Sequence, residues 1–153
     1  MGSFRVYATA AGIGAVAGLR SMTAPALVSR AAASGDLRIR EPRLRWMSAN
    51  ASAKTLTLLA LGEMIADKAP FIPNRTDAGP LSARIVSGGL CGAVICSAGK
   101  QSAIAGGIVG GLAAVGGAFL GYQARKRLPG FGTGLAEDVV AIGSGLAVLT
   151  SAR

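Results

Sequence analysis

The sequence contains no histidine, and it is poor in charged, aromatic and cysteine residues. Among 153 residues, 15% are charged, 5% are aromatic and two are cysteines, whereas a soluble domain has roughly 25% charged residues. The absence of histidine removes the commonest general base and the commonest transition-metal ligand. We therefore expect no enzymatic activity, no catalytic residues, no metal site and no cofactor.

The two cysteines do not form a recognisable redox or metal motif. Cys91 and Cys96 are five positions apart within an apolar run, a spacing that fits neither a CxxC redox pair nor a zinc site. Cysteine is among the most buried residue types. We interpret both as small buried residues of a helix.

What the sequence does contain is long apolar segments. Hydrophobic residues make up 51% of the chain and glycine contributes 23 residues, and a helix needs about 20 apolar residues to cross a bilayer. The apolar run after Arg5 is interpreted as a retained helix, because equally apolar segments recur to the C-terminus. We predict an all-α integral membrane protein, a single transmembrane domain over residues 1–153 with about five helices. The expected spans are 6–33, 51–69, 80–98, 102–122 and 134–150, with a basic loop over 34–50.

The first of these spans is too long for one straight crossing. The segment "GLRSMTAP", Gly18 to Pro25, interrupts it, with Arg20 near its middle and a proline that removes a backbone donor. Irregular backbone at membrane depth is tolerated where it is buried in protein or lines a cavity. We predict a break near Arg20–Pro25, which leaves open a broken helix or a re-entrant segment.

The net charge of +9 raises the alternative of a nucleic-acid partner. However, Arg38, Arg40, Arg43 and Arg45 lie between apolar spans, where basic loops set membrane orientation. We expect this loop on the cytoplasmic side, in contact with anionic lipid, and no nucleic-acid partner.

The fourth span, "SAIAGGIVGGLAAVGGAFLGY", carries a stripe of small residues on one helix face. Its glycines at helical spacing are Gly106, Gly110, Gly117 and Gly121. Such a stripe lets another backbone approach closely. Close packing within the chain and a homodimer seam are both consistent with it.

Charged residues concentrate in "GEMIADKAPFIPNRTDAGPLSAR", Gly62 to Arg84. Glu63 and Asp67 lie one turn apart on one helix face, and the prolines that follow bring Arg84 of the next helix back toward them. Charges at membrane depth are costly and face a partner or a water-filled cavity. For Asp67 and Lys68, a solvated position at the membrane surface is the alternative.

A second acidic pair, Glu137 and Asp138, precedes the last apolar run. A carboxylate that opens a helix is stabilised by the helix dipole. However, only about 12 apolar residues follow, roughly 18 Å of helix, so the pair is drawn below the headgroups unless the helix begins earlier. The "LPGFGTG" segment argues against an earlier start.

Together these charges form a nearly balanced, slightly acidic set, and a surplus carboxylate on a membrane path is a natural proton or cation site. The residues expected to line an ion or substrate path are Glu63, Asp67, Lys68, Asp77, Arg84, Glu137, Asp138 and Arg20.

The two charged segments resemble the bacterial membrane family catalogued as domain of unknown function 4126. Its members carry an acidic residue, then Ala-Asp-Lys-x-Pro, a later Asp, an Arg in the next helix, and Ala-Glu-Asp at the start of the last helix. The matching positions are Glu63, Ala66, Asp67, Lys68, Pro70, Asp77, Arg84, Ala136, Glu137 and Asp138. The chain departs from the family at Gly18-Leu19-Arg20-Ser21, where Gly-Ile-Asn and small residues are expected. The resemblance implies a multi-pass protein of the bacterial inner membrane and assigns no activity.

Two functions remain. The first is a small transporter or channel for an ion or small solute, proton-coupled through Glu63, with the charged cluster lining the path. On this interpretation Glu63→Gln removes pH-dependent flux and leaves the fold intact. The second is a membrane scaffold or assembly factor in which the same charges form a structural network.

Overall fold

The computed structural model describes residues 2–66, 78–127 and 131–151, and this part of the chain is helical and contains no strand. The predicted all-α fold is therefore confirmed for the described residues. The helices are α1 (Ser3–Leu19), α2 (Thr23–Ala33), the 3₁₀ helix η1 (Pro42–Ser48), α3 (Asn50–Ala66), α4 (Ala78–Ala98), α5 (Ala103–Arg127) and α6 (Phe131–Ser151).

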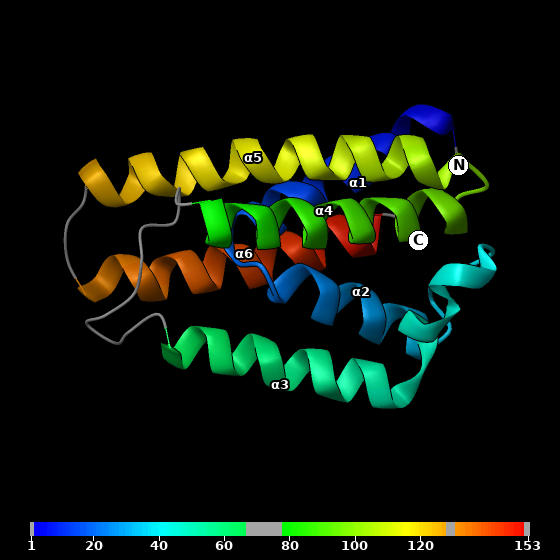
Figure 1. The fold of residues 1–153 in the computed structure, drawn as a ribbon, viewed down its shortest axis with the longest axis horizontal. Helices are drawn as coiled ribbons and strands as arrows, with labels where there is room; N and C mark the ends of the chain where they lie inside the picture. Colours follow the sequence, from blue (N-terminus) through cyan, green and yellow to red (C-terminus); the bar gives the residue numbers. More distant parts are fainter. Residues whose placement is uncertain (1, 67–77, 128–130, 152–153) are drawn as a thin grey trace.

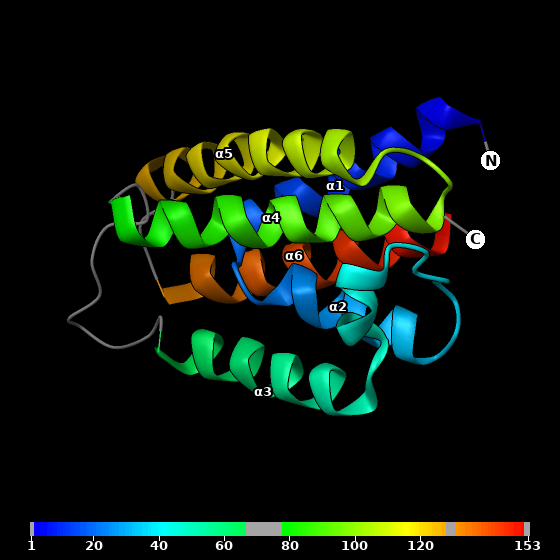
Figure 2. The same cartoon turned by 45° about the vertical axis from the view of Figure 1, so that its right-hand side comes forward.

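The long helices lie side by side in one bundle (Figures 1 and 2). Helices α1, α4 and α5 make the closest group, α6 packs on α1 and α2, and α3 lies at the edge, mainly against α2 and η1. Buried side chains of α1, α2 and α4, among them Ile13, Val28 and Val94, form the core between them. The position of α3 at the edge matters for the site described below.

The chain reverses direction between α1 and α2. Val6 near the start of α1, Gly35–Leu37 beyond the end of α2, and Ile95 near the end of α4 line one cavity of about 270 Å³. Both ends of the α1–α2 pair therefore lie at the same end of the bundle. The predicted break is present, and α2 returns along the bundle instead of continuing the direction of α1 (Figure 1).

The break lies at Arg20–Met22, just before Pro25. Arg20 has an extended backbone, with φ −141° and ψ 114°, while its N–H still donates to Val16 O and completes α1. Pro25 is the third residue of α2, where a backbone N–H would have no partner within the helix. The proline thus belongs to the first turn of a new helix, since it costs no hydrogen bond there.

Glycines allow three helices to approach at backbone distance. A Cβ added to Gly110 of α5 would overlap the carbonyl oxygen of Gly88 in α4, and one on Gly14 of α1 would overlap the carbonyl oxygen of Gly110. Gly92 and Gly106 make the same kind of contact between α4 and α5. Close packing of small residues is how helices associate in a bilayer.

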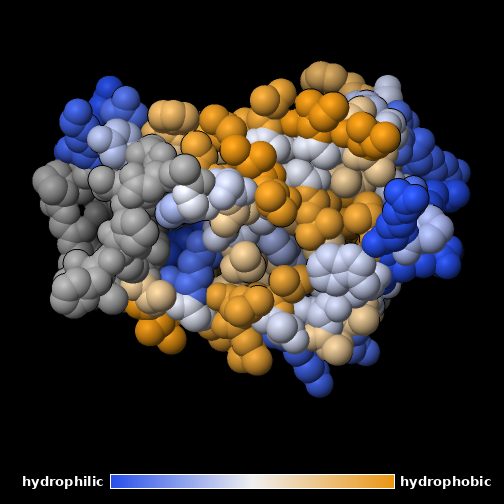
Figure 3. Space-filling view, viewed as in Figure 1, coloured by the Kyte–Doolittle hydropathy of each residue, from blue (hydrophilic) through white to orange (hydrophobic). Residues whose placement is uncertain are grey.

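Two described helices are long and apolar enough to cross a membrane by length and composition, α4 over Gly79–Ala98 and α5 over Ala103–Ala124. Hydrophobic residues cover the face that these helices present in Figure 3, and hydrophilic residues gather toward the ends of the bundle.

The last helix begins earlier than expected. Helix α6 starts at Phe131, so the segment "LPGFGTG" does not delay it, and Glu137 and Asp138 are its seventh and eighth residues. The interpretation of this pair as the residues that open the helix is wrong. With 21 residues, α6 is about 32 Å long at 1.5 Å per residue.

Candidate functional site

The carboxylate of Glu63, on α3, lies at the N-terminus of α2. Its Oε1 accepts hydrogen bonds from the Ser21 N–H at 2.9 Å and the Ser21 hydroxyl at 2.6 Å. Its Oε2 accepts one from the Met22 N–H at 2.8 Å. Ser21 and Met22 are the two residues directly before α2, and the N-terminus of a helix favours negative charge. Glu63 therefore supplies from another helix the anion that this end requires.

Beside this contact, Arg20 forms an ion pair with Asp138 of α6. Arg20 is 1% exposed and Asp138 is 8% exposed. The Arg20–Asp138 ion pair attaches the break between α1 and α2 to α6. The hydrogen bonds of Glu63 attach the same break to α3. A buried ion pair is costly to disrupt, because the remaining charge is left without compensation.

Thr23 of α2 and Arg84 of α4 are also buried. Thr23, in the first turn of α2, is 3% exposed, and its hydroxyl has no hydrogen-bond partner among the described residues. Arg84, near the start of α4, is 4% exposed. Arg84 is therefore enclosed by protein rather than turned to the surroundings.

The structure brings together three of the predicted path residues, Arg20, Glu63 and Asp138, around the break. Arg84 is buried as well. Asp67, Lys68 and Asp77 lie outside the described residues, as does the side chain of Glu137.

The predicted packing glycines contact helices of the same chain. Gly106 and Gly110 lie against α4, and Gly117 lies against the Ala15 backbone of α1. Gly121 is buried. A homodimer seam along Gly106 and Gly110 would have to displace α4, so these contacts agree with packing within one chain.

Sequence reasoning missed Ser21 and the backbone of Met22 as partners of Glu63. A signal was present in "RSMTAP", because Ser and Thr near a proline are typical of a helix start. That pattern predicts where a helix begins. It does not predict that the acid at its end comes from α3, 42 positions away.

Within the described residues, no group of three or more His, Cys, Asp or Glu side chains is placed to hold a metal ion. Cys91 and Cys96 are both buried and free. The chemistry of this region is therefore that of anchored carboxylates and buried cations. Such groups can exchange a proton or an ion, or can hold helices together.

The sequence matches the family described as Domain of unknown function (DUF4126) over residues 7–151. Neither curated proteins nor solved structures match the chain. The matched range includes both charged segments and every helix from the second turn of α1 to the end of α6. The chain therefore belongs to the DUF4126 family.

Proposed function

We propose that the chain is a multi-pass protein of the bacterial inner membrane, in which α3, α4, α5 and α6 cross the bilayer. The α1–α2 pair enters and leaves the membrane on the side of the basic loop, because both of its ends lie at that end of the bundle. Support comes from large apolar side chains that are exposed on several helices, because contiguous apolar surface marks a protein or membrane contact. These include Leu58, Leu59, Leu61 and Ile65 of α3, Ile104, Ile108, Leu112 and Leu120 of α5, and Val139, Val140 and Leu146 of α6.

The basic-loop end of this bundle is proposed to face the cytoplasm. The backbone N–H groups of Arg40 and Glu41 donate to the Ser97 hydroxyl at the end of α4, at 3.1 and 2.8 Å. This contact places the loop beside the turn that carries Lys100. The concentration of basic residues at one end favours that end inside.

Within this frame, we infer that the protein transports a small ion or solute past the α1–α2 break. The observation that carries this proposal is the N-terminus of α2, which is occupied by the Glu63 carboxylate beside the buried Arg20–Asp138 pair. Helix α2 has 11 residues, about 17 Å of helix, roughly half of the hydrocarbon thickness. Transporters build ion and substrate sites from discontinuous helices of this kind.

In this mechanism Glu63 is the exchangeable group. While ionised it accepts hydrogen bonds from Ser21 and Met22 and holds α3 against α2. When it takes up a proton or a cation, this attachment weakens. Helix α3 packs mainly on α2 and η1, so it is the helix best placed to move. Figure 3 shows a hollow with hydrophilic residues at its bottom between the start of α4 and the end of α3.

A membrane scaffold is the second candidate, and a specific observation favours it. Glu63 has three donors and Arg20 is paired with Asp138, as in a structural network. The two proposals differ in whether Glu63 titrates during function.

Flux distinguishes them. In proteoliposomes with an imposed pH gradient and a panel of ions and small solutes, transport predicts a flux that depends on pH and is lost in Glu63→Gln. Glu41→Gln is the matched control, because it removes a carboxylate from the basic loop and leaves the break intact. Absence of any flux in the parent protein, or full flux in Glu63→Gln, would replace transport by the scaffold.

Glu63→Gln is also expected to lower the free energy of unfolding. This differs from the expectation from sequence that the substitution leaves the fold intact. A glutamine amide keeps one oxygen and places an NH₂ group against the N–H of Met22 or Ser21, so that two donors face each other. Loss of a hydrogen bond to a charged acceptor costs about 1.5–3 kcal/mol. Chemical denaturation in detergent measures this change.

Ser21→Ala provides the graded comparison. It removes the hydroxyl donor and leaves both backbone donors to Glu63, so its cost is expected to be about 1 kcal/mol. Equal stability of Glu63→Gln and the parent protein would contradict the anchoring role of Glu63.

A further inference from the structure

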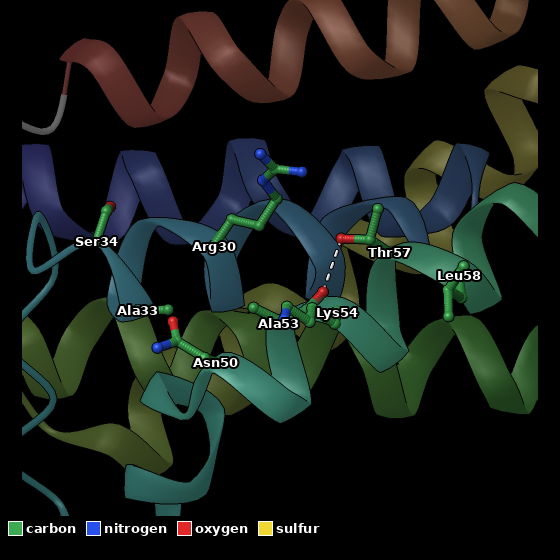
Figure 4. Close-up of a pocket in the computed structure, with 8 residues that line it drawn as sticks. All are labelled: Arg30, Ala33, Ser34, Asn50, Ala53, Lys54, Thr57 and Leu58. Atoms are coloured by element: carbon green, nitrogen blue, oxygen red, sulfur yellow. Dashed lines mark hydrogen bonds between the residues drawn. The ribbon is translucent and has the colours of Figure 1, made fainter.

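A groove between α2 and α3 lies apart from the Glu63 contact. It has a volume of about 640 Å³, within the range of pockets that hold small ligands, and it is lined by residues of both helices. Its polar lining residues are Arg30 of α2, Ser34 directly after α2, and Asn50, Lys54 and Thr57 of α3. Figure 4 shows these side chains along the two facing helices.

The charge of this groove is positive. Arg30 and Lys54 are both exposed, and none of the residues that line the groove is acidic. Asp36 accepts a hydrogen bond from Ser34 at 2.9 Å but does not line the groove. Two cations with the nearby amide of Asn50 fit a phosphate-bearing anion, whose oxygens accept charge-assisted hydrogen bonds.

The groove also has an apolar continuation along α3. Leu58 lines it and is 67% exposed, and Leu61 and Ile65, at 51% and 73%, follow toward the end of the same helix. The Thr57 hydroxyl donates its hydrogen to Ala53 O of the same helix at 2.7 Å (Figure 4). This part of α3 therefore offers little polar surface to a ligand. A ligand that extends from the cations along α3 therefore needs a charged head and an apolar tail.

We propose that this groove binds the phosphate headgroup of an anionic phospholipid, with its acyl chains along the exposed face of α3. The proposal rests on the membrane placement proposed above and not on transport. Basic pockets between membrane helices are known to bind anionic headgroups. A lipid bound here would contact both α2 and α3 and so would stabilise their attachment.

The test is lipid binding to the full chain in detergent, measured by native mass spectrometry and by the shift in thermal unfolding. Phosphatidylglycerol is compared with phosphatidylcholine and with inorganic phosphate at fixed salt. The parent protein is expected to bind phosphatidylglycerol and to unfold at a higher temperature with it. Arg30→Gln combined with Lys54→Gln should weaken binding roughly tenfold or more, because each cation near an anionic lipid contributes about one factor of five.

Lys126→Gln combined with Arg127→Gln is the matched control, because both residues are exposed at the end of α5 and neither lines the groove. This variant should keep parental affinity and lose only nonspecific attraction. Equal loss in the two double variants would overturn the site. Equal binding of phosphatidylcholine would overturn the anionic headgroup, and equal stabilisation by inorganic phosphate would overturn the lipid. Since none of these readouts involves flux, failure of transport leaves this result intact.

Discussion

Asp138→Asn is expected to lower the free energy of unfolding by about 3–5 kcal/mol, the usual cost of removing one partner from a buried ion pair. Asp138 pairs with Arg20, and Arg20 is almost fully enclosed, at 1% exposure. Asparagine keeps the size of the side chain and removes its charge, so the guanidinium loses this compensation. Chemical denaturation in detergent, followed by circular dichroism, measures the change.

A double-mutant cycle separates the pair from other effects of the substitution. Arg20→Met combined with Asp138→Leu removes both charges, and replacing a buried pair by apolar residues is often neutral or stabilising. The double variant should therefore have a larger free energy of unfolding than Asp138→Asn. Asp36→Asn, at an exposed position, should change stability by less than about 0.5 kcal/mol. If the effects of the single changes Arg20→Met and Asp138→Leu add up to the effect of the double variant, the pair contributes no coupling energy.

The second large effect is expected at the contact between α4 and α5. A Cβ on Gly110 would overlap the Gly88 carbonyl oxygen and would lie 3.1 Å from the Gly92 Cα. Because these atoms belong to helix backbone, the helices must separate to admit a methyl group. Gly110→Ala is therefore expected to cost about 3 kcal/mol, at the upper end of overpacking changes, and Gly110→Leu should cost more.

Gly116→Ala is the matched control in the same helix. A Cβ there meets nothing within 4 Å, and alanine is favoured over glycine inside a helix by roughly 0.5–1 kcal/mol. The same substitution should thus stabilise α5 at Gly116 and destabilise the bundle at Gly110. If Gly110→Ala and Gly116→Ala shift the thermal unfolding temperature by the same amount in the same direction, the close approach of α4 and α5 is contradicted.

These two contacts differ in how far the sequence predicts them. The spacing of Gly106, Gly110 and Gly117 places them on one face of a helix, since helical periodicity alone decides which residues share a face. It does not say which helix covers that face. In the structure α4 covers the first two and α1 covers Gly117, because the order of packing depends on the whole bundle.

The start of α6 shows a local signal that misled. Proline and glycines in "LPGFGTG" argue for a late start, because both are poor helix formers. The structure begins the helix at Phe131. Tertiary packing overrides a weak local preference, and this shift moves Glu137 and Asp138 away from the helix end.

By itself, the sequence determined that the protein is helical, where most of its helices lie, and that the first apolar segment breaks near Arg20. Periodicity, apolar run length and proline position are local properties that suffice for these conclusions. Only the tertiary structure decided that α2 turns back, that Glu63 occupies its N-terminus and that Arg20 pairs with Asp138. The physical reason is that an unpartnered charge or helix end shows that a partner is needed, while its identity depends on which distant helices the packing brings together.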